Sequence, residues 1–260
     1  MLPVLFYVFG FPVQSYGVSK ALAALVGAYL LGRAFARHGL DKERAHSLVL
    51  WATLWGFVGA KLYFVAENLE SFSWHLLGGS GFVWYGGLIG GVLAALIIIR
   101  RDELPLSTVA GAVAAPLSVA YGIGRIGCFL AGDGTYGKPT TLPWGMAFPD
   151  GVVPTAAEVH PTALYETLAA FAIAGILWAI GRRWAPSAVF GAYLTLSGFV
   201  RLLVEFLRIN QPVVLGLTGA QLFGVASITV GVALVIAGRQ GLIGRPISAQ
   251  PEASPAAARP

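Results

Sequence analysis

Seven long apolar segments, separated by short polar loops, are the feature that most constrains the fold of this sequence. Of its 260 residues, 57% are hydrophobic and 11% are charged, whereas soluble domains carry about 25% charged residues. A membrane-spanning helix needs about 20 mostly apolar residues. We therefore expect an all-α, polytopic transmembrane helical bundle of about seven helices, over residues 15–31, 46–66, 82–99, 106–130, 161–180, 188–207 and 218–237.

The basic residues predict how the bundle lies in a membrane. They gather after the first, third and fifth segments and after the last, at Arg33, Arg37, Lys42, Arg44, Arg100, Arg101, Arg182, Arg183, Arg239, Arg245 and Arg259. The loops on the other side carry few: 67–81 has none and 137–160 has only Lys138. Because cytoplasmic loops are rich in Lys and Arg, we expect the N-terminus outside and the C-terminus inside. Residues 238–260, rich in Ala, Pro and Arg, are predicted to be a disordered cytoplasmic tail.

The same pattern excludes several classes of function. The formal net charge of +5 arises in short loops between apolar segments, which indicates topology and not a nucleic-acid surface. The single cysteine, Cys128, excludes an intramolecular disulfide and a CxxC metal site. The four histidines are scattered along the chain, so we expect neither a metal site nor a cofactor.

The stretch 122–137 joins an apolar segment to a polar loop and is rich in glycine. It carries Arg125 and Asp133 in what we expect to be a break in the helix. Charged groups at membrane depth are costly and mark functional sites, and irregular backbone there must line a cavity or be buried in protein. The alternative is an arginine that extends to the interface and an aspartate in an ordinary turn.

A second set of charges lies near the end of the sixth segment. Arg201, Glu205 and Arg208 follow one another at spacings of four and three, so we expect them on one helical face. Glu205 then holds the arginines in place, and at least one guanidinium keeps donors free for a phosphate such as a lipid headgroup. The alternative is an internally compensated ion pair that locks two helices together.

Further candidates lie at the predicted outer ends of other segments. Tyr16 and Tyr85 place phenol groups there, as proton-transfer groups or as members of an interfacial aromatic belt. Gly86 and Gly87 allow helices to approach closely. His160 either titrates or anchors the loop, and Glu166 is expected to pair with a basic group across the bundle.

Taken together, these residues resemble the prolipoprotein diacylglyceryl transferase family. The likeness covers nearly the whole chain in order, and its strongest part is the signature Gly-Arg-x-Gly-Asn-Phe-x-Asn-x-Glu-x-x-Gly, which corresponds to residues 124–137. Cys128 and Ala131 stand in place of asparagines there, Asp133 in place of glutamate, and one extra residue precedes Gly137. Tyr85 stands where many members have histidine. The other matching stretches are Tyr16-Gly17, Gly59-Ala-Lys-Leu-Tyr63, Tyr85-Gly-Gly-Leu-Ile-Gly90, His160-Pro-Thr-Ala-Leu-Tyr-Glu166, Arg201-Leu-Leu-Val-Glu-Phe-Leu-Arg208 and Gln221.

The resemblance implies transfer of a diacylglyceryl group from phosphatidylglycerol to the lipobox cysteine of prolipoproteins, with release of glycerol phosphate. It implies phosphatidylglycerol, membrane lipids and prolipoprotein signal peptides as partners, and a multi-pass protein of the bacterial inner membrane with its site toward the outer leaflet. Residues 1–237 would then form a single transmembrane catalytic domain. The implied catalytic residues are Arg125, Arg201, Asp133 and Tyr85, and the implied substrate-binding residues are Tyr16, Gly86, Gly87, His160, Glu205 and Arg208.

Three questions stay open at the level of sequence. The proton acceptor is Asp133, Tyr85 or His160, and we expect Asp133 to position other groups in preference to accepting a proton. Cys128 is expected to be a small apolar filler and not a nucleophile. The competing functions are a protein that binds or flips an anionic lipid, and a family member with a different acceptor.

Overall fold

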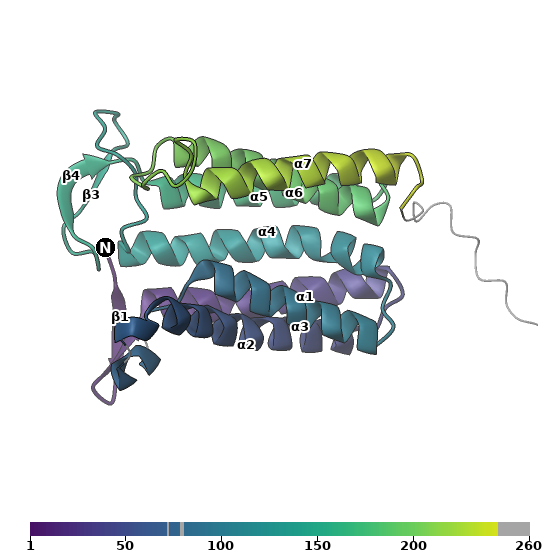
Figure 1. Ribbon diagram of the computed structural model, residues 1–260, viewed down its shortest axis with the longest axis horizontal. Coiled ribbons are helices and arrows are strands. Elements are labelled where there is room, and N and C mark those ends of the chain that lie inside the picture. Colours follow the sequence, from purple (N-terminus) through teal and green to yellow (C-terminus); the bar gives the residue numbers. More distant parts are fainter. Residues whose placement is uncertain (72, 79–80, 244–260) are drawn as a thin grey trace, which may run out of the picture. The chain divides into compact units, whose positions relative to one another are not determined.

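The computed structural model describes residues 1–71, 73–78 and 81–243. Within this part of the chain, seven helices of 18 to 26 residues are long and apolar enough to cross a membrane (Figure 1). At 1.5 Å per residue they span about 27–39 Å, which matches a hydrocarbon core of about 30 Å. The predicted helical membrane bundle is thus confirmed, as α1 (Ser15–Arg37), α2 (Lys42–Glu67), α3 (Trp84–Arg101), α4 (Leu106–Ala131), α5 (Thr162–Ile180), α6 (Pro186–Glu205) and α7 (Gly219–Arg239).

Local capping explains where several helices begin. Asp41 accepts a hydrogen bond from the Glu43 N–H at 3.0 Å, so α2 begins four residues before the expected position. Thr218 and Gln221 form a capping box at the start of α7, which satisfies two of the N–H groups left free at a helix end. The α7 helix continues to Arg239, and residues 244–260 of the predicted tail lie outside the described residues.

The chain divides into two compact units. One contains residues 24–109, and the other contains residues 1–23 and 110–260. In the first unit α2 packs along α3, and glycines set the spacing of the pair. A Cβ at Gly86 would overlap Gly59 O and Tyr63 Cβ, and a Cβ at Gly59 would overlap Gly86 O. Gly86 is therefore a packing residue between α3 and α2.

In the second unit, α6 packs along α7 and against α5. Its apolar core joins α4, α5 and α6 through small and branched side chains, namely Ala114, Ala115, Ile173, Leu177, Val189 and Ala192. Two glycine pairs bring α6 close to α7: a Cβ at Gly191 would lie 2.6 Å from Gly231 O, and one at Gly198 would lie 2.8 Å from Gly224 O. Small residues at such crossings let helix backbones approach in lipid.

Two β-hairpins and two short 3-10 turns were not expected from the sequence. The strands are β1 (Val4–Val8), β2 (Phe11–Gln14), β3 (Met146–Phe148) and β4 (Thr155–Val159), paired antiparallel as β1–β2 and β3–β4. The turns are η1 (Leu69–Ser71) and η2 (Trp74–Leu77). The β3–β4 hairpin lies at the end of the unit where α4 ends and α5 begins (Figure 1). The N–H groups of Val152 and Val153 bond to the carbonyls of Ala131 and Gly132 at 2.8 and 2.9 Å, which fastens the hairpin to the end of α4.

The segment around Gly137 ties together the elements that carry the predicted charges. Its N–H bonds to His160 O at 2.8 Å, and the next N–H, of Lys138, bonds to Leu207 O at 2.7 Å. A Cβ at Gly137 would lie 2.5 Å from Leu207 O, so only glycine fits. This close approach places the start of α5 and the residues after α6 beside the loop that follows α4.

Candidate active site: a buried cluster of arginines and glutamates

Glu166 lies at the centre of the candidate site. It is on the first turns of α5, and only 1% of the residue is exposed. Its Oε2 pairs with Arg125 Nη2 from α4, and its Oε1 lies 3.0 Å from Arg201 Nη1 of α6. The Tyr121 hydroxyl donates to the same Oε1 at 3.1 Å. The expected pairing of Glu166 with a basic group is therefore confirmed, and the partners are the two arginines implied for catalysis.

Glu205 forms the second half of the cluster. Its Oε2 lies 2.9 Å from Arg201 Nη2 and 3.8 Å from Arg208 Nε. Its Oε1 accepts hydrogen bonds from Thr218 Oγ1 at 2.8 Å and from Asn210 Nδ2 at 2.6 Å. Arg201 thus bridges the two glutamates, and the capping residue of α7 orients Glu205.

One detail of the expected geometry is wrong. The α6 helix ends at Glu205, so Arg208 is not on the helical face that carries Arg201 and Glu205. The chain turns at 206–207, and the Arg208 N–H bonds to Glu205 O at 3.1 Å. Arg208 Nη1 donates to Thr135 O at 3.1 Å. The turn therefore directs this guanidinium toward the loop that follows α4.

The glycine-rich stretch also differs from expectation, because the helix is unbroken through Arg125. The α4 helix ends at Ala131, and the turn begins at Gly132, with φ of 58°, followed by Gly134 with φ of 81°. Glycine adopts such positive φ values without steric cost. Arg125 therefore sits on regular helix, and only Asp133 lies in the irregular segment. Glycines within the helix serve close packing: a Cβ at Gly127 would lie 2.5 Å from Ser19 Cβ of α1.

The five residues Arg125, Glu166, Arg201, Glu205 and Arg208, here called the arginine–glutamate cluster, carry three positive and two negative charges. One positive charge is therefore in excess. Removal of a charge from water costs several kcal/mol, and an unpaired one is strongly destabilising. Burial, helped by repulsion from Arg201 and Arg125, lowers the pKa of Arg208 to about 10 from its usual 12.5, against the attraction of Glu205. Arg208 still carries its proton near neutral pH, so the cluster attracts an anion.

Two nitrogen donors in the cluster are available to such an anion. Among the described residues, the buried Nε atoms of Arg125 and Arg208 have no hydrogen-bond partner. Buried donors usually have partners. The side chain of Arg201 is also 27% exposed, whereas that of Glu166 is 1% exposed. The cluster thus combines fixed, paired guanidinium groups with donors left over, an arrangement suited to phosphate.

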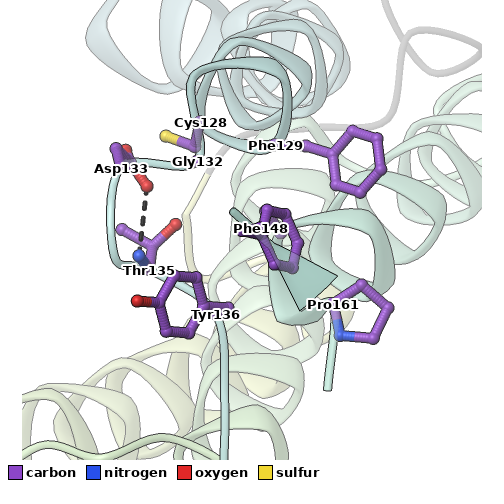
Figure 2. A pocket seen from close by; sticks show the side chains of 9 residues that line it. Cys128, Phe129, Gly132, Asp133, Thr135, Tyr136, Phe148 and Pro161 are labelled. Atoms are coloured by element: carbon purple, nitrogen blue, oxygen red, sulfur yellow. Dashed lines mark hydrogen bonds between the residues drawn. The ribbon is translucent and has the colours of Figure 1, made fainter. Parts of the chain in front are cut away.

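A small hollow lies next to the cluster, at the end of α4. It has about 170 Å³ of empty space, part of which is open to solvent, and Cys128, Phe129, Gly132, Asp133, Thr135, Tyr136, Phe148, Pro161 and Ala163 line it. Figure 2 shows Cys128 and Asp133 on one side and the rings of Phe129 and Phe148 on the other. The Cys128 sulfur lies 3.4 Å from Arg125 Nη1, which joins the hollow to the cluster. Drug-sized ligands fill about 300–1,000 Å³, so this space is too small for the acyl chains of a lipid.

Asp133 organises the loop beside this hollow. Its Oδ1 accepts the Thr135 N–H at 3.1 Å, as drawn in Figure 2. The Thr135 carbonyl then accepts from Thr162 Oγ1 at 2.5 Å and from Arg208 Nη1 at 3.1 Å. Asp133 forms no ion pair with an arginine of the described residues. This loop connects Asp133 to the cluster through the Thr135 carbonyl and Arg208.

The remaining predicted residues lie outside the cluster. His160 Nδ1 is 3.3 Å from Tyr165 Oη, which accepts a hydrogen bond from Trp144 Nε1 at 2.8 Å. Tyr16, on α1, is 41% exposed, and Lys20 Nζ lies 4.9 Å from the centre of its ring. Tyr85, Gly86 and Gly87 belong to the unit of residues 24–109, in α3. Within the described residues, no group of three His, Cys, Asp or Glu side chains could hold a metal ion.

Glu166, Tyr121 and Thr218 are not among the site residues predicted from the sequence. For Glu166 a signal was present, because a carboxylate inside an apolar helix must find a cation. For Tyr121 and Thr218 no comparable signal existed. Their hydroxyl groups take part only because α4, α5, α6 and α7 come together around the two glutamates.

The chain is similar to known proteins over most of its length. The family model of prolipoprotein diacylglyceryl transferase matches residues 3–237. A protein of Clostridium tetani is 32% identical over 214 residues, which cover 80% of this chain and 86% of that protein. A protein of Finegoldia magna is 29% identical over 247 residues, which cover 92% of this chain and 97% of that protein. A protein of Geobacter sulfurreducens is 33% identical over 220 residues, which cover 79% of this chain and 82% of that protein. All three are named phosphatidylglycerol–prolipoprotein diacylglyceryl transferase.

Proposed function

Because the chain belongs to the prolipoprotein diacylglyceryl transferase family, we propose that it transfers the diacylglyceryl group of phosphatidylglycerol to a cysteine thiol of prolipoproteins. The observation that carries this proposal is the arginine–glutamate cluster, with three guanidinium groups on two buried carboxylates. A bundle of membrane-spanning helices can reach both substrates in the bilayer. The net positive charge of the arginine–glutamate cluster matches the single negative charge of the phosphodiester in the lipid headgroup.

Arg125 and Arg201 bind the phosphate in this mechanism. Glu166 holds one nitrogen of each guanidinium, so the two groups are already oriented when the lipid arrives. The thiolate sulfur attacks the glycerol carbon that bears the phosphate, the C–S bond forms and the C–O bond breaks. The electron pair of the C–O bond leaves with glycerol phosphate. Oriented donors at the point where charge develops stabilise that step most.

Glu205 and Arg208 support the same anion from the other side of Arg201. Glu205 keeps Arg201 in place through the 2.9 Å contact, and Arg208 links the cluster to the Thr135 carbonyl. We propose that Asp133 positions this loop, since its carboxylate accepts the Thr135 N–H. His160 anchors the start of α5 through its contact with Tyr165, and Tyr16, on α1, contacts the substrates.

The basic loops support a definite orientation for this chemistry. The loop between α4 and α5 carries only Lys138 over residues 137–160, so by the positive-inside rule this end of the two helices faces outward. The relatives are bacterial. We therefore place the protein in the bacterial cytoplasmic membrane, with the site toward the outer leaflet, the N-terminus outside and the C-terminus inside.

A transfer assay tests the proposal. Purified protein is incubated with labelled phosphatidylglycerol and a peptide that contains a lipobox cysteine, and the peptide is examined by mass spectrometry. We expect the mass of one diacylglyceryl group on the cysteine and release of glycerol phosphate. Lipid binding or flipping without turnover would contradict transfer and support a lipid-binding protein. Lipid turnover without peptide modification would point to a different acceptor.

A further inference from the structure

Lys20 is a cation inside a membrane-spanning helix that the mechanism above does not use. It is on α1, five residues after the first residue of that helix, Ser15. Its Nζ lies 4.9 Å from the centre of the Tyr16 ring, and it forms no ion pair with a carboxylate of the described residues. A lysine in a membrane segment is costly unless it finds a partner or serves a function. The contact with an aromatic ring compensates only part of that cost.

The ammonium group of Lys20 lies against α4 at Gly124. A Cβ at Gly124 would be only 3.3 Å from Lys20 Nζ, and Gly124 precedes Arg125 directly. Gly124 and Cys128 are one turn apart on the same face of α4, and Cys128 lines the hollow next to the cluster. Lys20 is about 8 Å into α1, and Arg125 about 9 Å from the neighbouring end of α4, so the two cations lie at the same depth.

The charge balance of the transfer step calls for such a group. A phosphodiester carries one negative charge, and the attacking thiolate carries another. The products are a neutral thioether and a phosphate monoester, so both charges end on the phosphate. A phosphate monoester carries about −1.5 to −2 at neutral pH. The single excess positive charge of the arginine–glutamate cluster balances the one negative charge of the phosphodiester substrate. It does not balance the second negative charge of the leaving phosphate monoester.

We propose that Lys20 is a phosphate-binding residue that recognises the second negative charge of the departing glycerol phosphate. Its ammonium, held on the Tyr16 ring and against the backbone at Gly124, supplies the positive charge that the cluster lacks. The inference rests on the proposed transfer function. It assigns a dianionic phosphate monoester as the preferred ligand of this part of the site.

Calorimetric binding of two soluble headgroup compounds tests this assignment without turnover. Glycerol phosphate is a dianion, and glycerophosphoglycerol, the deacylated headgroup, is a monoanion. We expect Lys20→Met to weaken binding of glycerol phosphate about tenfold or more, as for the loss of one charge-assisted hydrogen bond. Binding of glycerophosphoglycerol should change less than about threefold. Lys20→Arg should restore the dianion preference, and Lys42→Met, at the exposed start of α2, should match the wild type.

The proposal would be overturned if Lys20→Met weakened the binding of both compounds equally or changed the binding of neither. It would also be overturned if the wild type did not bind glycerol phosphate. Melting temperatures of all variants show whether the fold is kept, and Lys20→Gln replaces Lys20→Met if the latter does not accumulate. The peptide assay separates the two ideas. A wild type that does not modify the peptide contradicts the proposed function, whereas a wild type that does, with Lys20→Met unchanged in binding, contradicts the role of Lys20 alone.

Discussion

Each carboxylate of the arginine–glutamate cluster holds two guanidinium groups, and Glu166 holds the two that we propose to bind phosphate. Glu166→Gln keeps the size of the side chain but removes its charge. Because loss of one member of a buried ion pair costs about 3–5 kcal/mol of stability, we expect the melting temperature to fall. Both phosphate-binding guanidinium groups also lose their anchor, so we expect transfer to fall by about 100-fold or more, as for the loss of an oriented donor. Glu158→Gln, at an exposed residue of β4, is the control. Near-normal transfer by Glu166→Gln would contradict this role.

Asp133 is also best tested at the scale of the residue. Asp133→Asn keeps an oxygen that accepts the Thr135 N–H but removes the negative charge, whereas Asp133→Ala removes both. If Asp133 positions the loop, Asp133→Asn should retain transfer within about tenfold and Asp133→Ala should lose more, because a neutral hydrogen bond is worth about 1 kcal/mol. Steady-state kinetics with the lipobox peptide measure both variants. Equal and nearly complete loss in the two variants would make Asp133 the proton acceptor.

The sequence could predict the ion pairs but not the full network. Charges in apolar helices must pair, so partners for Glu166 and Glu205 follow from composition, and both pairings are confirmed. The hydroxyl groups of Tyr121 and Thr218 could equally have bonded to their own helices or to water. The prediction for Arg208 is wrong because α6 ends at Glu205. Asn210 and Pro212 signal a helix end nearby but do not fix the residue at which it falls.

At the scale of the element, glycine contacts set the distance between α2 and α3. A Cβ at Gly86 would overlap backbone and side-chain atoms of α2, whereas one at Gly87 would lie 3.4 Å from Gly56 O, an ordinary contact. We therefore expect Gly86→Ala to lower the melting temperature by several degrees, since overpacking costs about 1–3 kcal/mol. Gly87→Ala should change it little. Equal melting temperatures for the two variants would contradict close packing of α2 on α3 at Gly86.

The helices could be predicted because their apolar length is set by the bilayer, and each expected segment corresponds to one of α1 to α7. Their ends could not be predicted as well. The start of α2 is decided by a single hydrogen bond, the one that Asp41 accepts. The regular helix through Arg125 is decided by the packing of α4 against its neighbours. The hairpins β1–β2 and β3–β4 have strands of three to five residues, which are too short to give a periodic pattern.

At the scale of the whole molecule, the predicted orientation can be measured with single cysteines. In a Cys128→Ala background, which we expect to remain active because Cys128 fills space beside glycines, Glu158→Cys and Arg182→Cys mark the two sides. A membrane-impermeant maleimide added to intact spheroplasts should label Glu158→Cys at once. It should label Arg182→Cys only after permeabilisation. The reverse pattern would invert the topology and would move the arginine–glutamate cluster to the inner leaflet.

In the proposed mechanism, Arg125 and Arg201 together bind the phosphate of the lipid headgroup. The most direct test is the rate of diacylglyceryl transfer to the lipobox peptide by Arg125→Lys and Arg201→Lys, which keep the charge but lose the planar, two-pronged donor geometry. Arg239→Lys, at the far end of α7, is the control. We predict a loss of about 100- to 1,000-fold in kcat/KM for both site variants, as for removal of an oriented donor, with the control unchanged. Near-normal transfer by both site variants would contradict the account.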